Sequence, residues 1–403
     1  MKPPLHVLWI PSWYPQKENP LLGSFFQEQI QALNKIGVQT GIIYPEIRPL
    51  KEFNFPLLKQ NYFQTSFQIE QSTPIYRRHG WNLYPGKFKW QINAWVRQAL
   101  NLFENYISSF GRPHLIHAQS SLIAGMAALE IARKYCIPYC VTEHRDVFLK
   151  KKVLKEDYST CWCTPYIKNA LDHANKIIAV SMPLKEALFS YTSQASISII
   201  PNSVDIDLFC PPLQKKQKEN FSYLTVCNLE KRKNVDLLLK SFQKVYKNDP
   251  KSDLVIVGEG PERAYLERLA KELEISRGVS FRGALSRQEV SQSFQEADAF
   301  VLASQNESFG VVCIEALASG IPVIATKCGG PETIVTPDGG LLVEKDDEIS
   351  LTNALIQIKN TIHHYPSEKL RSLAVSEYSQ KAVAEKTLLL YQSLLTLSSP
   401  CAA

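Results

Sequence analysis

The sequence predicts two doubly wound α/β domains that follow one another along the chain. Short apolar runs alternate with helical patterns, and this alternation occurs twice. A segment rich in Pro, Lys and Gln at residues 201–220 separates the two halves and is predicted to be a linker. Runs that are apolar at nearly every position predict strands buried on both faces, which is typical of parallel sheets covered by helices.

Six strands are expected in the first half of the chain, with helices between them. The segments 46–82 and 146–164 are interpreted as loops. The expected strands are Leu5–Ile10, 38–45, Leu115–Gln119, Pro138–His144, Lys176–Ser181 and Ser196–Ile200, and the expected helices are Ser24–Ile36, Lys89–Ser109, Ser121–Tyr135 and Met182–Ser190.

The second half repeats the pattern, and from about residue 346 the chain is expected to be helical. The predicted domains are residues 1–205, residues 206–375, and a C-terminal helix with a flexible tail, 376–403, which packs back on the first domain. The expected strands of the second half are Ser222–Asn228, Asp253–Gly260, Val279–Gly283, Ala299–Ser304, 322–326 and Gly340–Glu344.

Composition places the chain among ordinary globular proteins, with 45% hydrophobic and 21% charged residues. The apolar run at the N-terminus is short and is interrupted by Pro11, so it is not a signal peptide. No apolar stretch reaches the roughly 18 residues that span a bilayer. The nine cysteines are scattered along the sequence, and we expect them to be reduced thiols. We therefore expect a cytoplasmic protein.

Two basic clusters lie in the first half, at 76–90 and at 148–155. The first contains Arg77, Arg78, Lys87 and Lys89 and is interleaved with aromatic residues such as Trp81. Such a mixture fits peripheral contact with the anionic inner face of a membrane, where each surface cation contributes about 1 kcal/mol. The alternative is an ordinary solvated face. No nucleic-acid-binding motif accompanies the charge.

Polar or glycine-rich residues follow four strands of the second half, where ligands of such sheets bind. The segments are "CNLEKRKN", "VGEGPE", "FRGALS" and "SQNESFG". Gly258 and Gly260 fit a tight turn or a close approach of backbone to a ligand. The third glycine of the dinucleotide fingerprint is missing, which argues against a nicotinamide dehydrogenase. Lys231, Arg232 and Lys233 are cations placed to meet a diphosphate.

Two glutamates mark the segment "ESFGVVCIEALASGIPVIAT". Glu307 precedes an apolar helix and Glu315 lies inside it, so each needs a protein cation or a ligand. Eight residues of helix span roughly 12 Å, which is too far for the carboxylate pair of a glycosidase. The free amides at the helix start, near Gly310–Val312, favour phosphate between the two carboxylates. A nucleotide sugar has this layout of ribose, diphosphate and hexose.

This segment, together with "CGGPE", resembles the E-x7-E signature of the retaining glycosyltransferases of family 4, which have the GT-B fold. The segments "PSWYPQKENPLLGSFFQEQIQALNKIGVQT", "PNSVDIDLF", "VGEGPERAYLERLAKEL" and "VSFRGALSRQEV" are similar to other parts of that family. The resemblance covers essentially the whole chain. It implies two facing Rossmann-like domains around a cleft, the first binding the acceptor and the second the nucleotide sugar.

The resemblance also implies roles for individual residues. Glu307 would bind hydroxyls of the transferred sugar, and Glu315 those of the ribose. His144 matches a histidine on the anomeric side of the sugar, and we take Glu307 and His144 as the catalytic residues. The remaining implied donor contacts are Gly23, Lys233, Gly258, the backbone near Arg282 at the base, and the amides of Phe309, Gly310, Val311 and Val312.

The sequence departs from the family pattern at two places. Asn228 stands where an arginine is usual, and Arg232 is the residue that could compensate. Gln119 stands where many members have a second histidine, which leaves His117 and Gln119 as uncertain residues on the acceptor side. The Asp205–Asp207 pair looks like a metal motif of another glycosyltransferase fold, but it lies in the linker, so we predict no metal.

The predicted function is transfer of a hexose, with retention, from a nucleoside diphosphate sugar, and a UDP-sugar is the expected donor. No cofactor besides this co-substrate is expected. The acceptor would be a saccharide or a lipid-linked sugar in the synthesis of a surface polysaccharide, lipopolysaccharide or glycolipid. Two alternatives stay open. One is a nucleotide-sugar 2-epimerase of the same fold, and the other is a relative that binds the nucleotide sugar without catalysis.

Overall fold

The protein is described by a computed structural model that covers residues 4–19, 22–149, 162–214 and 218–397. The chain divides into two compact units. Unit 1 contains residues up to Val180, Lys185–Ile200 and the chain from Val383 onward, and unit 2 contains Ser181–Leu184 and Pro201–Ala382. The first division falls five residues before the predicted boundary at 205, and the second falls seven residues after the predicted boundary at 375.

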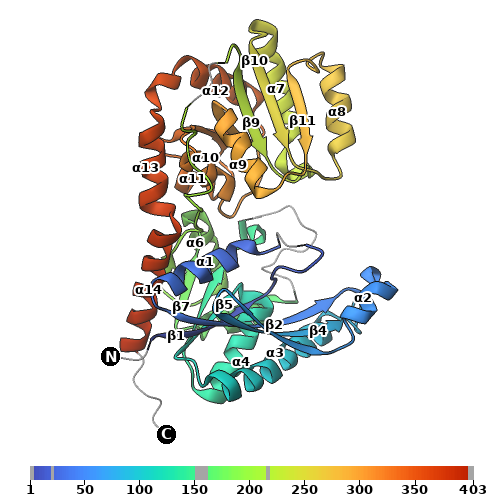
Figure 1. The fold of residues 1–403 in the computed structure, drawn as a ribbon, viewed down its shortest axis with the longest axis vertical. Helices are drawn as coiled ribbons and strands as arrows, with labels where there is room; N and C mark the ends of the chain where they lie inside the picture. The colour runs from blue at the N-terminus through green and yellow to red at the C-terminus, as the bar shows by residue number, and fades with distance from the viewer. Residues whose placement is uncertain (1–3, 20–21, 150–161, 215–217, 398–403) are drawn as a thin grey trace. The chain divides into compact units, whose positions relative to one another are not determined.

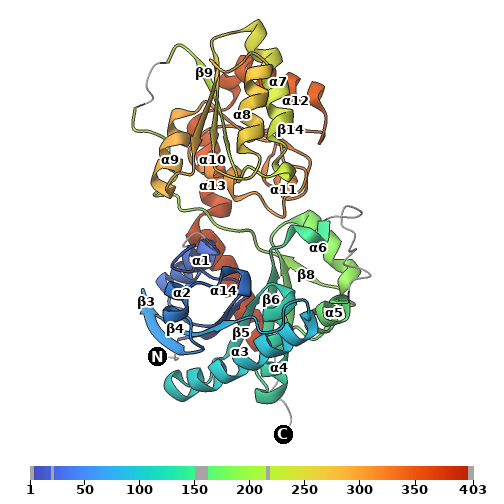
Figure 2. The same cartoon turned by 90° about the vertical axis from the view of Figure 1, so that its right-hand side faces the viewer.

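Unit 1 is built on an eight-stranded sheet with the order β3-β4-β2-β1-β5-β6-β7-β8. The strands pair in parallel except for β3, which is antiparallel to β4. Helices lie on both faces of the sheet, α1 on one and α3 and α4 on the other (Figures 1 and 2). The strands are β1 His6–Pro11, β2 Gln39–Arg48, β3 Thr65–Glu70, β4 Thr73–Trp81, β5 Leu115–Gln119, β6 Tyr139–Glu143, β7 Lys176–Ala179 and β8 Ile197–Ile199.

The helices of unit 1 follow the predicted order but differ in detail. The expected helix from Ser121 is wrong over its first turn, because Ile123 has a left-handed φ of 71° and α4 begins only at Met126. The amide and hydroxyl of Ser121 both bind the buried Glu143 carboxylate instead of continuing a helix. The helices are α1 Ser24–Lys35, α2 Phe55–Gln60, α3 Phe88–Phe110, α4 Met126–Tyr135 and α5 Thr164–Asp172, together with α6 Met182–Leu188 and α14 Gln380–Leu397, which each cross a unit boundary.

Unit 2 has a six-stranded parallel sheet with the order β11-β10-β9-β12-β13-β14. Its core is formed by apolar residues of β9, β10 and α7 that are almost fully buried, including Leu238, Phe242, Leu254 and Ile256. The strands are β9 Phe221–Val226, β10 Ser252–Val257, β11 Val279–Gly283, β12 Ala299–Leu302, β13 Val323–Thr326 and β14 Gly340–Val343. The helices are α7 Val235–Asn248, α8 Arg263–Glu272, α9 Arg287–Glu296, α10 Val311–Ala318, α11 Pro331–Ile334, α12 Glu348–Asn360 and α13 Ser367–Tyr378.

The predicted loop at 46–82 is wrong. It contains the end of β2, the short helix α2 and the antiparallel pair β3–β4. The charges of β4 suggested a solvated segment, but Arg77 is buried against Glu46, and Trp81 is also buried and donates its ring N–H to the Asn61 carbonyl. Most of the second basic cluster, from residue 150, lies outside the described residues.

Strand order determines where each sheet can hold a ligand. In unit 2 the chain runs outward from β9 through β10 to β11 and then returns to β12 on the other side of β9. In unit 1 the chain similarly returns from β4 to β5, beside β1. Loops at such reversals leave a crevice at the carboxyl ends of the two strands. The loops after β9 and β12, and those after β1 and β5, are therefore where functional side chains are expected.

Candidate active site

In unit 2 the reversal between β9 and β12 brings Lys233 and Glu307 together. Lys233 Nζ forms an ion pair with Glu307 Oε1, although the two residues are 74 positions apart. The Ser304 hydroxyl donates to the same oxygen at 2.8 Å. The two predicted ligand contacts are thus direct partners in this structure. Ser304 was missed by the sequence analysis, and its place at the end of a buried strand was the available signal.

The backbone at Glu307 is fixed by the "CGG" segment that follows β13. The Glu307 amide donates to the Cys328 carbonyl at 3.0 Å, and the Gly330 amide donates to the Glu307 carbonyl at 2.7 Å. A Cβ at Gly330 would lie 2.2 Å from Cα of Phe309, so only glycine allows this approach. These contacts hold the loop that carries the carboxylate rigidly, which a positioned functional group requires.

Helix α10 begins directly after this loop. Its N-cap is Gly310, with a left-handed φ of 91°, and no side chain caps the helix. The amides of Val311 and Val312 begin the first turn, where helix amides have no partner within the helix. Phe309 is buried, with its ring against Tyr378 at 6.1 Å. An uncapped helix start beside a lysine favours an anion such as a diphosphate.

Glu315 lies on the second turn of α10 and is buried, with 5% of its surface exposed. Arg287 Nη1 lies 3.6 Å from Glu315 Oε1, so a protein cation does accompany this carboxylate. Arg287 is the first residue of α9, inside the capping box formed by Ser286 and Glu289, and its guanidinium lies over the Phe209 ring. Arg287 was missed by the sequence analysis, and the "SRQE" capping box was the signal that placed it at a helix start.

The other predicted donor residues of unit 2 are spread along neighbouring strand ends. Gly258 has a φ of 131°, and a Cβ there would lie 1.8 Å from the Cys227 carbonyl oxygen, so this turn requires glycine. Asn228 follows β9 and is exposed. Arg232 pairs with Glu230 at 2.7 Å, and the Arg282 side chain pairs with Glu296 at 2.9 Å.

In unit 1, His144 and Gln119 lie in contact at the ends of β6 and β5. His144 Nε2 is 2.8 Å from Gln119 Oε1, within hydrogen-bond distance. His144 Nδ1 is buried and has no hydrogen-bond partner among the described residues. Burial lowers the pKa of His144 to about 4. His144 is thus a neutral imidazole with one ring nitrogen, Nδ1, that no described residue contacts.

Aromatic rings surround this histidine. The rings of Phe25 and Phe26 lie 5.3 Å from the His144 ring, and that of Trp13 lies 6.4 Å away. Gly23 is the N-cap of α1 with a φ of 73°, and a Cβ there would lie 3.0 Å from Trp13. The predicted glycine and histidine therefore belong to one cluster in unit 1.

His117 is a structural residue of the unit 1 core. Its Nδ1 lies 2.6 Å from the Tyr391 hydroxyl on α14, and its Nε2 lies 2.7 Å from Thr142 Oγ1. Both ring nitrogens are therefore occupied by protein partners. Burial, with a smaller contribution from His144, lowers the pKa of His117 to about 3.

Glu143 supports the backbone on which His144 sits. Its carboxylate accepts from the Ser120 hydroxyl at 2.9 Å and from the His144 amide at 3.0 Å. Burial would raise the pKa of Glu143, but the Arg145 guanidinium and the hydrogen bonds from Ser121 outweigh it and lower the pKa to about 2. This network was also missed, although "TEHRD" places four charged or titratable residues at a strand end.

The buried histidines predict that unit 1 loses stability in mild acid. His117 and His144 have ordinary pKa values near 6.5 in the unfolded chain and about 3 and 4 in the folded one. Between pH 6.5 and 4 the unfolded chain binds more protons than the folded one. As the pH decreases through this window, the free energy of unfolding therefore falls by about 1.4 kcal/mol per pH unit for each histidine. Thermal unfolding of the full chain at several pH values will show a falling midpoint in this window.

A matched pair of variants tests this assignment. His117→Asn should reduce the slope of the unfolding midpoint against pH, whereas His363→Asn, which changes an exposed histidine of unit 2, should leave the slope unchanged. An identical midpoint at pH 7 and pH 5 in the wild type would contradict the burial argument.

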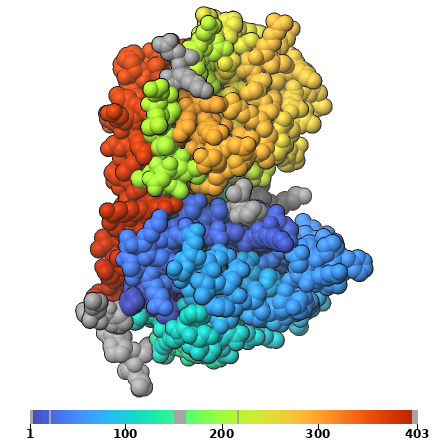
Figure 3. Space-filling view, viewed as in Figure 1, coloured from blue at the N-terminus to red at the C-terminus, as the bar shows by residue number. Residues whose placement is uncertain are grey.

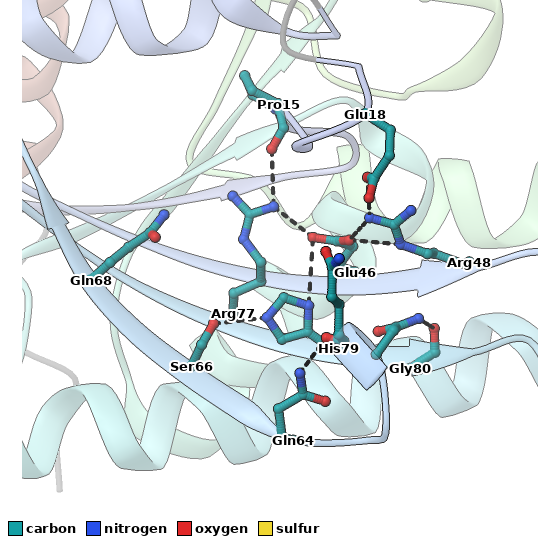
Figure 4. A network of polar contacts seen from close by, with 12 residues as sticks. Pro15, Glu18, Glu46, Arg48, Gln64, Ser66, Gln68, Arg77, His79 and Gly80 are labelled. Atoms are coloured by element: carbon teal, nitrogen blue, oxygen red, sulfur yellow. Dashed lines mark hydrogen bonds and ion pairs between the residues drawn. The ribbon is translucent and has the colours of Figure 1, made fainter. Parts of the chain in front are cut away.

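Unit 1 also contains a polar network on β2 and β4 (Figure 4). Its centre is Glu46, whose carboxylate pairs with both Arg48 and Arg77 at 2.6 Å. His79 Nδ1 lies 3.9 Å from the same carboxylate. Arg77 also donates to the Pro15 carbonyl at 2.9 Å. The sequence analysis did not identify this network, because its members come from a segment interpreted as a loop.

Comparison with known proteins identifies the family and the fold. Residues 22–208 match the family described as Glycosyltransferase Family 4, and residues 211–369 match that described as Glycosyl transferases group 1. This chain belongs to the glycosyltransferases. Among solved structures, this glycosyltransferase is similar to sucrose-phosphate synthase from Thermosynechococcus elongatus, with a TM-score of 0.76 at 20% identity, covering 98% and 100% of the two chains. The predicted GT-B fold is confirmed.

Curated relatives are glycosyltransferases as well. The chain is 26% identical to TuaC of Bacillus subtilis, a protein named for teichuronic acid biosynthesis, over 88% of this glycosyltransferase and 90% of the relative. It is 27% identical to the alpha-monoglucosyldiacylglycerol synthase of Streptococcus pneumoniae, over 66% of this chain and 64% of the relative. A structure of HepE from Anabaena in complex with UDP has a TM-score of 0.71 at 17% identity, covering 96% and 100%.

Proposed function

We propose that this glycosyltransferase moves a hexose, with retention of configuration, from a UDP-sugar to a saccharide or lipid-linked acceptor. The observation that carries the proposal is the uncapped start of α10, which has Lys233 and Glu307 on the preceding loops and Glu315 on its second turn. The Lys233 ammonium and the α10 amides bind the diphosphate, Glu315 the ribose, and Glu307 the transferred sugar. The acceptor belongs to surface polysaccharide, lipopolysaccharide or glycolipid synthesis.

The chemistry we propose is front-side attack without a covalent enzyme intermediate. The acceptor oxygen bonds to the anomeric carbon on the face from which the diphosphate leaves, and a departing phosphate oxygen takes the acceptor proton. The helix amides and Lys233 stabilise the charge that develops on the diphosphate, in place of a bound metal. His144 and Glu307 position the sugar.

Calorimetry with UDP, GDP, ADP and dTDP tests the donor assignment. We expect UDP to bind the full chain at least about tenfold more tightly than the other three. If another diphosphate binds most tightly, the donor nucleotide carries that base instead of uracil. GDP is a relevant competitor because one relative, at 34% identity over 42% of this chain, is named a GDP-mannose-dependent mannosyltransferase. Absence of binding by all four would contradict the donor site.

We also propose that unit 1 contacts an anionic membrane surface from the cytoplasmic side. No described helix is long and apolar enough to cross a bilayer. Twelve of the nineteen exposed large apolar or aromatic side chains among the described residues lie between Leu50 and Trp90, beside Lys51, Lys87 and Lys89. This segment projects at the right of unit 1 in Figure 3, in light blue. Such a concentration is typical of an interaction surface.

Co-sedimentation with vesicles tests this contact. Wild type should bind vesicles that contain phosphatidylglycerol more than those of phosphatidylcholine alone, and Lys87→Gln with Lys89→Gln should weaken the binding about tenfold or more. The paired change Lys247→Gln with Lys271→Gln removes equal charge from exposed positions of unit 2 and is the control. Equal effects of the two pairs would contradict a localised contact.

A further inference from the structure

Strand β3 is an open edge of the unit 1 sheet. It pairs with β4 on one side only and stands last in the strand order, at the margin of unit 1 in Figure 2. Every residue of β3 is exposed or half-buried. Its two apolar side chains, Phe67 and Ile69, have exposed fractions of 47% and 63%. No proposed donor contact lies on β3.

The turn between β3 and β4 determines which backbone groups of β3 face outward. Gln71 and Ser72 connect the strands, both with positive φ, which is typical of a two-residue hairpin loop. The flanking residues, Glu70 and Thr73, are therefore a hydrogen-bonded pair. Along an antiparallel pair such residues alternate with non-hydrogen-bonded ones. The even-numbered residues of β3 thus bond to β4, and the odd-numbered residues turn their backbone groups outward.

A backbone contact next to β3 supports this alternation. The His79 amide donates to the Gln64 carbonyl at 2.9 Å, so another even-numbered residue bonds toward β4. The amides and carbonyls of Thr65, Phe67 and Ile69 therefore point to the open side, where no strand of the described chain pairs with them. Such a row of backbone donors and acceptors fits the edge of another strand.

This edge lacks the usual features that prevent strand pairing. Exposed edge strands are often very short, or carry lysine, proline or a bulge. With six residues, β3 is the longest of the edge strands that the structure describes, and it contains no Lys, Arg or Pro. Its register with β4 has no bulge. Its one charge, Glu70, already accepts from Gln27 at 2.9 Å and from Gln68 at 2.6 Å.

The sequence of β3 is complementary to itself when two copies run antiparallel about Gln68. Gln68 then faces Gln68 of the other copy, and each Phe67 faces an Ile69. Phe67 and Ile69 form hydrogen-bonded pairs, because their backbone groups point outward, and aromatic and β-branched side chains are favourable cross-strand neighbours. The two Gln68 carboxamides can donate to and accept from each other. Ser66 faces Glu70, so no like charges meet.

The apolar side chains of β3 belong to a cluster that the second copy would extend. The Phe67 ring lies 4.9 Å from the Tyr76 ring of β4 and 5.8 Å from the Phe110 ring of α3. Ile69 lies on the same face of the sheet, since side chains alternate along a strand. In the antiparallel arrangement the clusters of the two copies adjoin, and their exposed apolar surface is removed from water.

We infer that two copies of this chain associate through β3, which joins their eight-stranded sheets into one. The occupant of the edge is a second copy because β3 matches itself in backbone phase, in side-chain pairing and in charge. The interface is isologous, so each contact occurs twice. A single strand pair buries a small area, which is typical of weak and reversible association. The dimer fraction should therefore rise with protein concentration.

Single cysteine substitutions test the register. Gln68→Cys places two thiols at a non-hydrogen-bonded pair, where Cα atoms are about 4.5 Å apart and a disulfide can form. Mild oxidation with glutathione disulfide should cross-link this variant as a dimer. Ser66→Cys and Glu70→Cys should each fail to cross-link alone, because like positions lie more than about 12 Å apart, but should form a mixed dimer when combined. Wild type, with its nine native cysteines, is the background control.

Analytical ultracentrifugation measures the association itself. Ile69→Lys places two lysines in each interface and should raise the dissociation constant of the dimer about tenfold or more. Ile349→Lys is the matched control, because Ile349 is 67% exposed on α12 of unit 2, and it should leave the constant unchanged. Thermal unfolding establishes that each variant folds.

Three outcomes would overturn the inference. They are a wild type that stays monomeric up to about 1 mM, cross-linking of Ser66→Cys alone as efficient as that of Gln68→Cys, and a dimer that Ile69→Lys does not weaken. A monomer whose binding to anionic vesicles is weakened by Ile69→Lys would assign this edge to the membrane and would overturn the inference as well.

Discussion

Glu307→Gln will lower the turnover number by about 10²–10³-fold and change UDP affinity by less than about threefold. Only Oε1 of Glu307 is held by the protein, through Lys233 and Ser304, and Oε2 has no partner among the described residues. That oxygen is available for a sugar hydroxyl that UDP lacks. A contact made to the reacting sugar lowers turnover when it is lost, by an amount typical of one preorganised polar group.

Release of UDP from UDP-glucose, with calorimetry on the same preparations, checks this result. Glu344→Gln is the matched control, since it neutralises the glutamate of an exposed Lys–Glu pair in the same unit, with 63% of the Glu344 side chain exposed. It should leave both quantities unchanged. If Glu307→Gln lowers UDP affinity as much as turnover, the prediction is wrong. Glu307 would then act on the diphosphate through Lys233 and would not contact the transferred sugar.

Glu315→Ala will have the complementary effect and weaken UDP binding by about 10- to 100-fold, as expected for a hydrogen bond to a charged group. Glu315 is buried and lies 3.6 Å from Arg287, so a protein cation accompanies the carboxylate before the nucleotide binds. Turnover at saturating UDP-sugar should fall much less, because the ribose does not react.

Calorimetry on two substitutions measures this effect. Glu315→Gln retains the shape and one acceptor oxygen and should have an intermediate affinity, while thermal unfolding establishes that both variants fold. Unchanged UDP affinity in Glu315→Ala would remove Glu315 from the ribose site. The helix amides and Lys233 would then be the remaining support for the donor assignment.

Much of the fold could be predicted because its signals are local. The buried strand β5 and the edge strand β11, in which half-buried and exposed residues alternate, were both predicted with the observed bounds. The pair β3–β4 was missed because its alternation of apolar and charged residues looks like a solvated segment. Whether Arg77 faces water or Glu46 depends on β2 lying beside β4, which no local pattern records.

The sequence by itself determined the two α/β domains, the residues at the strand ends of unit 2 and the helix start between two glutamates. These follow from periodicity and spacing within a few tens of residues. Only the tertiary structure decided which charges are already paired: Lys233 with Glu307, Glu315 with Arg287, and Arg77 with Glu46. The physical reason is that an ion pair depends on distance in space, and strand order brings together residues that are far apart in the chain.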